Sequence, residues 1–136
     1  MPPWTPTREL RKRNFLPRRM GYMIKTLEQE AYEKALQDKS YPEFKPGDVV
    51  EVKLALPENQ RRTIPVRGIV IAIRNRGIRT SFTILNNIPG GGNIERTFPL
   101  FCPTIQELRV VQKQRIKARR AKLYYLCDRK PSEFKV

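Results

Sequence analysis

The spacing of apolar residues changes once along the chain, from a helical period to a strand-like period. Ile24, Leu27, Ala31 and Ala35 fall on one helix face if residues 20–39 are helical. Only two of these four side chains are large, so we expect the helix to pack on a surface and not in a deep core. Its acidic residues would be repelled by nucleic acid, which suggests that it faces protein or solvent.

After this helix the pattern is that of short strands. Val50, Val52 and Leu54 alternate with polar neighbours, as in a half-buried strand. A second strand over residues 64–74 is apolar on both faces through 69–73, so both faces of its middle must be covered. Three further strands are marked by Phe82 and Ile84, by Ile94 and Phe98, and by Leu108 and Val110. Five short strands with closely spaced turn signals predict a small, strongly bent β-barrel.

Glycines mark turns and one position inside a strand. Pro46 and Gly47 predict a turn just before the first strand. Gly68 lies within the second strand, where curvature or a close backbone approach is expected. The run 90–92 lacks the context of a nucleotide-binding loop. It predicts a mobile or tightly turning loop between two strands, and the open alternative is a loop whose backbone N–H groups approach a phosphate.

These patterns divide the chain into four segments. They are a basic extended arm (1–20), an N-terminal helix (21–40), the barrel (44–111) and a basic C-terminal extension (112–136). Four prolines among the cations of the arm argue against a long helix there. The same prolines argue against an amphipathic targeting presequence, so any such signal is expected to be already removed or to lie outside this sequence.

Positive charge is concentrated at the two ends of the chain. The net charge is +15, of which residues 1–25 carry +6 and residues 113–136 carry +7. Folding gains nothing from such self-repulsion, so a polyanionic partner is the economical explanation, with a solvated charged face as the alternative. Guanidinium groups match phosphate oxygens, and tyrosine rings can stack on bases or riboses. The candidate RNA contacts of the C-terminal run are Lys113, Arg115, Lys117, Arg119, Arg120, Lys122, Tyr124 and Tyr125.

Further candidate RNA contacts lie in turns and in the arm. Loop cations at the ends of a barrel position a protein on phosphates without reading sequence. A simply solvated side chain is the alternative for each of them. The candidates in the turns are Arg61, Arg62, Arg74, Arg76 and Arg79, and those in the arm are Arg11, Lys12, Arg13, Arg18 and Arg19.

Residues for catalysis are lacking. There is no histidine, the usual side chain for proton transfer near neutral pH. Cys102 and Cys127 lack the partners of a zinc site and are expected to be free thiols in a reducing compartment, with one disulfide between them as the alternative. The acidic residues of the barrel are scattered. We therefore expect no enzyme, no metal, no cofactor, no small-molecule substrate and no membrane span.

Several motifs occur in an order typical of one family. They are IKTLEQE (24–30), FKPGDVVEV (44–52), VRGIVIAIRNRGIRTSFTI (66–84), IERTFPL (94–100) and RRAKLYYL (119–126). With these motifs the chain resembles the bacterial-type large-subunit ribosomal protein number nineteen, over about residues 22–127. Of these motifs, RRAKLYYL and IERTFPL are the most specific.

The resemblance implies a mostly β fold, a small SH3-like β-barrel with an N-terminal helix and basic N- and C-terminal extensions. It implies a structural constituent of the large ribosomal subunit that binds large-subunit ribosomal RNA near the subunit interface. Members of the family support an inter-subunit bridge to small-subunit RNA and lie beside large-subunit proteins number fourteen and number three. The family's loop arginines correspond to Arg79 and Arg96.

Departures from the family pattern bear on compartment and on function. The family usually has His-Ser where this chain has Phe101 and Cys102, its glycine loop differs, and the sequence diverges after Leu126. The arm at 1–20 has no counterpart in bacterial forms. These features suggest a mitochondrial ribosome in the matrix, with a plastid or the bacterial cytoplasm as alternatives.

The alternative function is an SH3-like nucleic-acid-binding module of a transcription or elongation factor. Both tails are expected to become ordered only on RNA.

Overall fold

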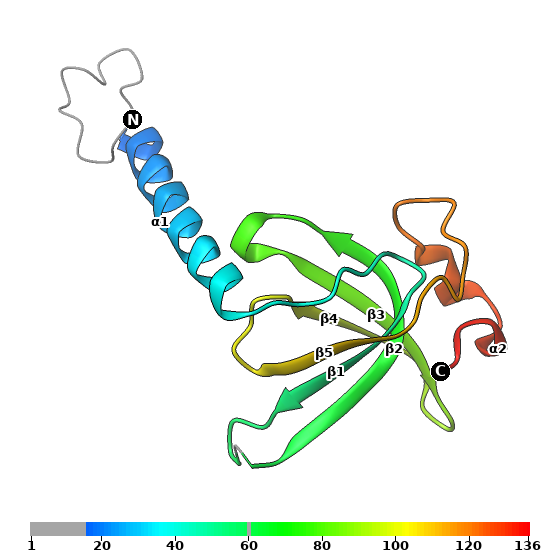
Figure 1. Ribbon diagram of the computed structural model, residues 1–136. Coiled ribbons are helices and arrows are strands. Elements are labelled where there is room, and N and C mark those ends of the chain that lie inside the picture. The colour runs from blue at the N-terminus through cyan, green and yellow to red at the C-terminus, as the bar shows by residue number, and fades with distance from the viewer. Residues whose placement is uncertain (1–15, 60) are drawn as a thin grey trace. The chain divides into compact units, whose positions relative to one another are not determined.

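Five antiparallel strands form a single sheet, which follows an N-terminal helix (Figure 1). The computed structural model describes residues 16–59 and 61–136, with side chains from Met20 onward. The elements are α1 (Leu16–Asp38), β1 (Val49–Ala55), β2 (Thr63–Arg74), η2 (Gly77–Arg79), β3 (Ser81–Ile88), β4 (Gly92–Pro99), β5 (Ile105–Gln112), η3 (Tyr124–Asp128) and α2 (Pro131–Phe134). The chain divides into two units, Met1–Lys39 and Ser40–Val136.

Helix α1 begins at Leu16, earlier than the sequence pattern predicted. Pro17 is its second residue, and proline is tolerated there because the first N–H groups of a helix have no partner within it. The last five residues of the predicted extended arm are therefore helical. Farther along, Gln29 donates a hydrogen bond to Glu33 across one helical turn, at 2.9 Å. Of the apolar face predicted for this helix, Ile24 and Leu27 are exposed.

The strands of the sheet lie in the order β4-β3-β2-β1-β5. Val52 of β1 faces Val66 of β2 on one side and Leu108 of β5 on the other. Among the described residues β4 and β5 remain the two edges, so the barrel predicted from the strand pattern is not closed by hydrogen bonds. Pro99 ends β4 and Pro103 follows it, and neither residue can donate to a closing ladder.

Both faces of the sheet carry a core, as the apolar middle of β2 predicted. On one face, which we call the extension side, the C-terminal extension (112–136) covers the sheet. The core there consists of Val49, Ile69, Ile71, Ala72, Leu85, Leu123, Leu126 and Phe134. The opposite core consists of Val50, Val52, Val70, Phe82, Ile84, Ile105 and Leu108. Residues from β5 and, partly buried, Phe98 of β4 share this second core, so the sheet bends around it.

A bulge in β2 determines which residues of this strand lie on each face of the sheet. The pairing of β2 with β3 shifts between Val70 and Ala72, so Ile71 has no partner residue on β3. Strict alternation would place Ile71 and Ala72 on opposite faces. Instead both lie in the core on the extension side, while Ile73 packs against the opposite core. The carbonyl oxygen of Ile71 accepts a hydrogen bond from the N–H of Leu123 at 2.8 Å. The bulge thus helps attach the C-terminal extension.

The C-terminal extension is part of the folded unit, contrary to the expectation that this tail orders only on RNA. Leu123, Leu126 and Phe134 are at most 1% exposed, and each contacts the core of the sheet. Three buried apolar side chains supply the burial that a solvated basic tail would lack. The prediction failed because the many cations around these three residues hid their apolar spacing.

Two of the glycine predictions are confirmed. A Cβ at Gly68 would lie 2.8 Å from the backbone oxygen of Leu85, so β2 and β3 approach closely at this point. Gly90 and Gly92 have φ values of +80° and +79°, and the N–H of Gly91 donates to the oxygen of Ile88 at 2.9 Å. The glycine run is a tight turn between β3 and β4 because it needs positive φ twice.

Candidate nucleic-acid interface

The start of the C-terminal extension is fixed by the turn before β1. The buried carboxylate of Asp48 accepts hydrogen bonds from the N–H groups of Lys45 and Gln114, both at 2.8 Å. The oxygen of Gly47 accepts from the N–H of Ile116 at 3.3 Å. This turn therefore binds two segments that are far apart in the sequence. The basic residues that follow Ile116 start from a defined position on the sheet.

Gly47 can be replaced only at a cost to this attachment. Its φ is +97°, and a Cβ there would lie 2.2 Å from the backbone oxygen of Ile116. We expect Gly47→Ala to lower the free energy of unfolding by about 3 kcal/mol or more, because backbone strain of about 1–3 kcal/mol adds to the displacement of Ile116. Urea denaturation followed by circular dichroism measures this effect.

Gly90→Ala is the matched control for Gly47→Ala. Its φ is also positive, but no atom lies within 4 Å of the added Cβ. In this variant the free energy of unfolding should fall only by the cost of backbone strain. Equal losses of stability in the two variants would contradict the attachment of the extension at Gly47.

A hollow of about 400 Å³, which we call the basic hollow, lies on the C-terminal extension. It is lined by Lys117, Arg119, Arg120, Tyr125 and Arg129. The guanidinium carbons of Arg120 and Arg129 lie 5.7 and 5.8 Å from the centroid of the Tyr125 ring, within the range of cation–π attraction. The Tyr125 side chain is half-buried against the core on the extension side. Its ring therefore joins the hydrophobic core to two exposed cations.

The cations of the C-terminal extension are not neutralised by acidic side chains. Within residues 16–59 and 61–136, none of the lysines and arginines from Lys113 to Arg129 forms an ion pair. Two acidic side chains of the sheet pair with cations of the sheet itself. Glu51 lies 3.0 Å from Arg67, and Glu107 pairs with Lys53 at 2.6 Å and with Arg109. The extension thus presents unpaired positive charge beside a sheet whose own cations are partly paired.

A second contact joins the extension to the end of β2. The Arg74 guanidinium donates a hydrogen bond to the Tyr124 hydroxyl at 3.1 Å, and Tyr124 is 40% exposed. The structure therefore brings Arg74 beside the C-terminal run, although the two are 50 positions apart. The other predicted residues of that run, Lys113, Arg115 and Lys122, are exposed.

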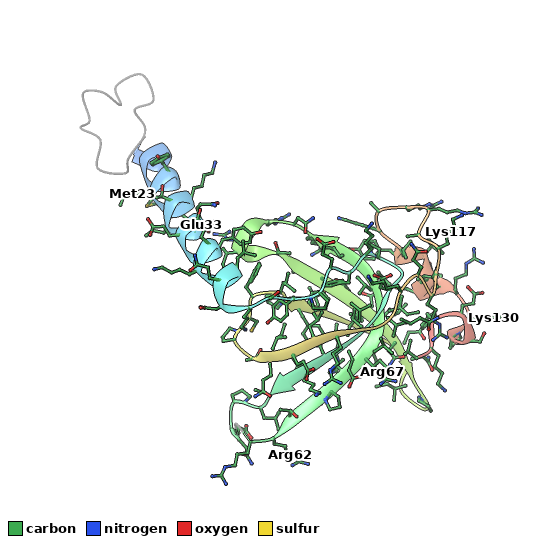
Figure 2. All side chains as sticks on the ribbon, in the orientation of Figure 1. Met23, Glu33, Arg62, Arg67, Lys117 and Lys130 are labelled. Atoms are coloured by element: carbon green, nitrogen blue, oxygen red, sulfur yellow. The ribbon has the colours of Figure 1, made fainter. Side chains whose placement is uncertain are left out.

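The remaining candidates are not gathered at the basic hollow. Figure 2 shows Arg62 at the end of the hairpin between β1 and β2, whereas Lys117 and Lys130 lie on the C-terminal extension. The other exposed candidates are distributed among this hairpin (Arg61), the turn around η2 (Arg76 and Arg79) and strand β4 (Arg96).

The candidates of the arm are only partly covered by the structure. Arg11, Lys12 and Arg13 lie outside the described residues. Arg18 and Arg19 fall in the first turns of α1, and their side chains also lie outside the described part.

One residue of the basic hollow was missed by the sequence reasoning. Arg129 follows the acidic Asp128 and falls in the segment where the family resemblance ends, so it was not grouped with the basic run. It nevertheless lines the basic hollow. Its position three residues after the end of the RRAKLYYL motif is the signal that could have identified it.

Neither Cys102 nor Cys127 forms a disulfide, and both thiols make local contacts. The Cys127 thiol donates to a carboxylate oxygen of Glu95 at 2.6 Å, and its carbonyl accepts from Asn93 at 3.0 Å. These bonds tie the extension to β4. Desolvation, followed by the neighbouring Glu95 carboxylate, raises the pKa of Cys127 to about 11, so this thiol stays protonated at neutral pH. The Cys102 sulfur lies 2.9 Å from the hydroxyl of Thr104.

Comparison with protein-family models identifies the group to which this chain belongs. Residues 23–136 match the model described as ribosomal protein L19. The chain belongs to the ribosomal protein L19 family. An L19 protein is a structural protein of the large ribosomal subunit and not an enzyme, so this chain is located in the ribosome and serves translation. The family resemblance predicted from the motifs is confirmed, and the alternative of a transcription or elongation factor module falls away.

The L19 match covers both the sheet and the C-terminal extension, including every residue of the basic hollow. Ribosomal RNA and neighbouring ribosomal proteins are the partners that membership of this family implies. Among the described residues, no helix is both long enough and apolar enough to cross a membrane.

Proposed function

We propose that this L19 protein binds large-subunit ribosomal RNA through its C-terminal extension, near the face that meets the small subunit. The observation that carries the proposal is the unpaired positive charge of the extension, which the described residues do not neutralise. RNA phosphates are the polyanion available to a large-subunit protein. Cations that replace their counterions gain binding free energy from the release of those ions.

The packing of the extension supports this proposal. Leu123, Leu126 and Phe134 anchor the extension in the core, and Asp48 fixes its beginning. Cations on an ordered segment lose less conformational entropy on binding than cations on a solvated tail. The sheet therefore acts as a platform that presents the basic residues in one arrangement.

Finer features of the function rest on the family resemblance. We propose that the protein supports an inter-subunit bridge to small-subunit RNA and contacts large-subunit proteins number fourteen and number three. We further propose a mitochondrial ribosome as its location, since the basic arm at 1–20 is an addition to the bacterial pattern. The bent sheet with its two cores is compatible with an SH3-like topology, which stays a prediction.

The salt dependence of RNA binding tests the electrostatic part of the proposal. If roughly eight phosphates are contacted, the logarithm of the affinity should fall against the logarithm of the salt concentration with a slope of about −6. Filter binding of the full chain to a large-subunit RNA fragment measures this slope. A slope near zero, or no affinity for RNA at low salt, would overturn the proposal.

A further inference from the structure

We propose that the basic hollow is a pocket for a phosphodiester group of the RNA backbone, in which Tyr125 holds two arginines in place and does not stack on a base. This inference rests on the proposed function and assigns a ligand to one site within it. It also changes the role that the sequence suggested for this tyrosine, because the ring is already in contact with guanidinium groups.

The first step is the position of the Tyr125 ring. Tyr125 lies in η3 between two residues whose side chains are fully buried, Leu123 and Leu126. The ring packs against the core on the extension side, so its orientation is set by the core. A ring that is held in this way cannot turn toward a base without losing buried contacts.

The second step is the pair of guanidinium groups. Arg120 comes from the loop before η3, and Arg129 comes directly after it. Both lie less than 6 Å from the centroid of one ring. Attraction to the ring offsets part of the repulsion between two like charges, and no described acidic residue pairs with either one. Two unpaired guanidinium groups on one hollow favour an anionic ligand.

The third step is the chemistry of an anion that would fit these groups. Arginine presents donors in a planar fork that fits two oxygens of a phosphate at once, and two such forks that line one hollow suit a phosphodiester. Lys117 and Arg119 complete the lining with further positive charge. The volume of about 400 Å³ lies in the range of ligand pockets, so a phosphate with an adjoining ribose can enter.

Single neutralising substitutions in the full chain test the pocket. Arg120→Gln and Arg129→Gln are each expected to weaken binding to a large-subunit RNA fragment about tenfold, because charge-assisted hydrogen bonds are lost. Lys130→Gln is the matched control. It removes the same charge from an exposed residue next to Arg129 that does not line the hollow, and it should weaken binding only about twofold.

Substitutions of the ring distinguish a scaffold from a stacking platform. Tyr125→Phe keeps the ring and should bind RNA like the parent protein. Tyr125→Leu removes the ring that holds both arginines. In the Tyr125→Leu background, Arg129→Gln should therefore weaken RNA binding by much less than tenfold, because the two substitutions are coupled. Thermal melting of each variant checks that the sheet remains folded.

The outcomes separate this inference from the proposed function. If the parent chain binds RNA with the expected salt slope, but Arg129→Gln and Arg120→Gln weaken binding no more than Lys130→Gln does, the pocket is wrong and the function stands. The pocket is also contradicted if each arginine substitution weakens RNA binding by the same factor in the Tyr125→Leu background as in the parent protein. If the parent chain does not bind RNA, the proposed function itself fails.

Discussion

The triple variant Arg119→Glu, Arg120→Glu, Lys122→Glu is expected to be absent from large ribosomal subunits while its sheet remains folded. All three side chains are exposed, so their replacement leaves both cores intact. The variant reverses three charges where RNA is proposed to bind, which removes favourable contacts and adds repulsion. We expect the affinity for RNA to fall by about three orders of magnitude and the salt slope to become shallower by about 2.

Sedimentation of the tagged variant with ribosomal subunits measures its incorporation, and circular dichroism of the purified protein reports its fold. The same three residues changed to Gln provide the control, since they lose the contacts without the added repulsion. This control should show an intermediate loss of binding. Normal incorporation of the Glu variant would contradict the role of the extension in anchoring RNA.

Phe134→Ala is expected to lower the free energy of unfolding by about 3–5 kcal/mol, the usual range for a large aromatic side chain removed from a core. Phe134 is 0% exposed and packs with Leu85, Leu123 and Leu126 on the extension side of the sheet. A loss of this size is comparable to much of the stability of a small domain. Urea denaturation followed by tyrosine fluorescence or circular dichroism measures it.

The neighbouring exposed residue serves as the control for this effect. Lys135→Ala should change the unfolding free energy by less than about 0.5 kcal/mol, as is usual for surface substitutions. If Phe134→Ala behaved like Lys135→Ala, the extension would be a dispensable tail and its packing on the sheet would be wrong. Because the basic hollow is built on this packing, Phe134→Ala should also weaken RNA binding.

The strands were accessible to sequence reasoning because their signals are local. In β1, Val50, Val52 and Leu54 alternate with polar residues, and all three lie in or against the opposite core. The doubly apolar stretch of β2 correctly indicated a strand covered on both faces. In the same way, the glycine run at 90–92 marked its turn, because positive φ depends on the residue itself.

The bulge at Ile71 and the open edges of the sheet could not be read from the sequence. A register shift between β2 and β3 depends on how the two strands pack on the rest of the chain, and no single residue type predicts it. Closure of the sheet into a barrel would require hydrogen bonds between β4 and β5. The apolar pattern of each strand is the same whether or not these two strands pair. The sequence pattern therefore predicted strands and bending, and it overestimated closure.

The candidate site shows the same division. The charge run from Lys113 to Lys122 was sufficient to identify the C-terminal extension as the basic surface. The place of Arg129 beside Tyr125, and of Arg74 beside Tyr124, required the folded chain. The sequence suggested that tyrosine rings of this run can stack on bases or riboses, which stays a prediction. Only the folded chain shows that the Tyr125 ring packs against the core and lies near two arginines.

The amino-acid sequence by itself determined the strand segments, the concentration of positive charge and membership of the L19 family, because each depends on residue type and order. Only the tertiary structure decided that the basic extension belongs to the core and that its cations surround a hollow. The reason is that burial is a property of distant contacts. Leu123, Leu126 and Phe134 become core residues only when the bulged face of β2 lies beneath them.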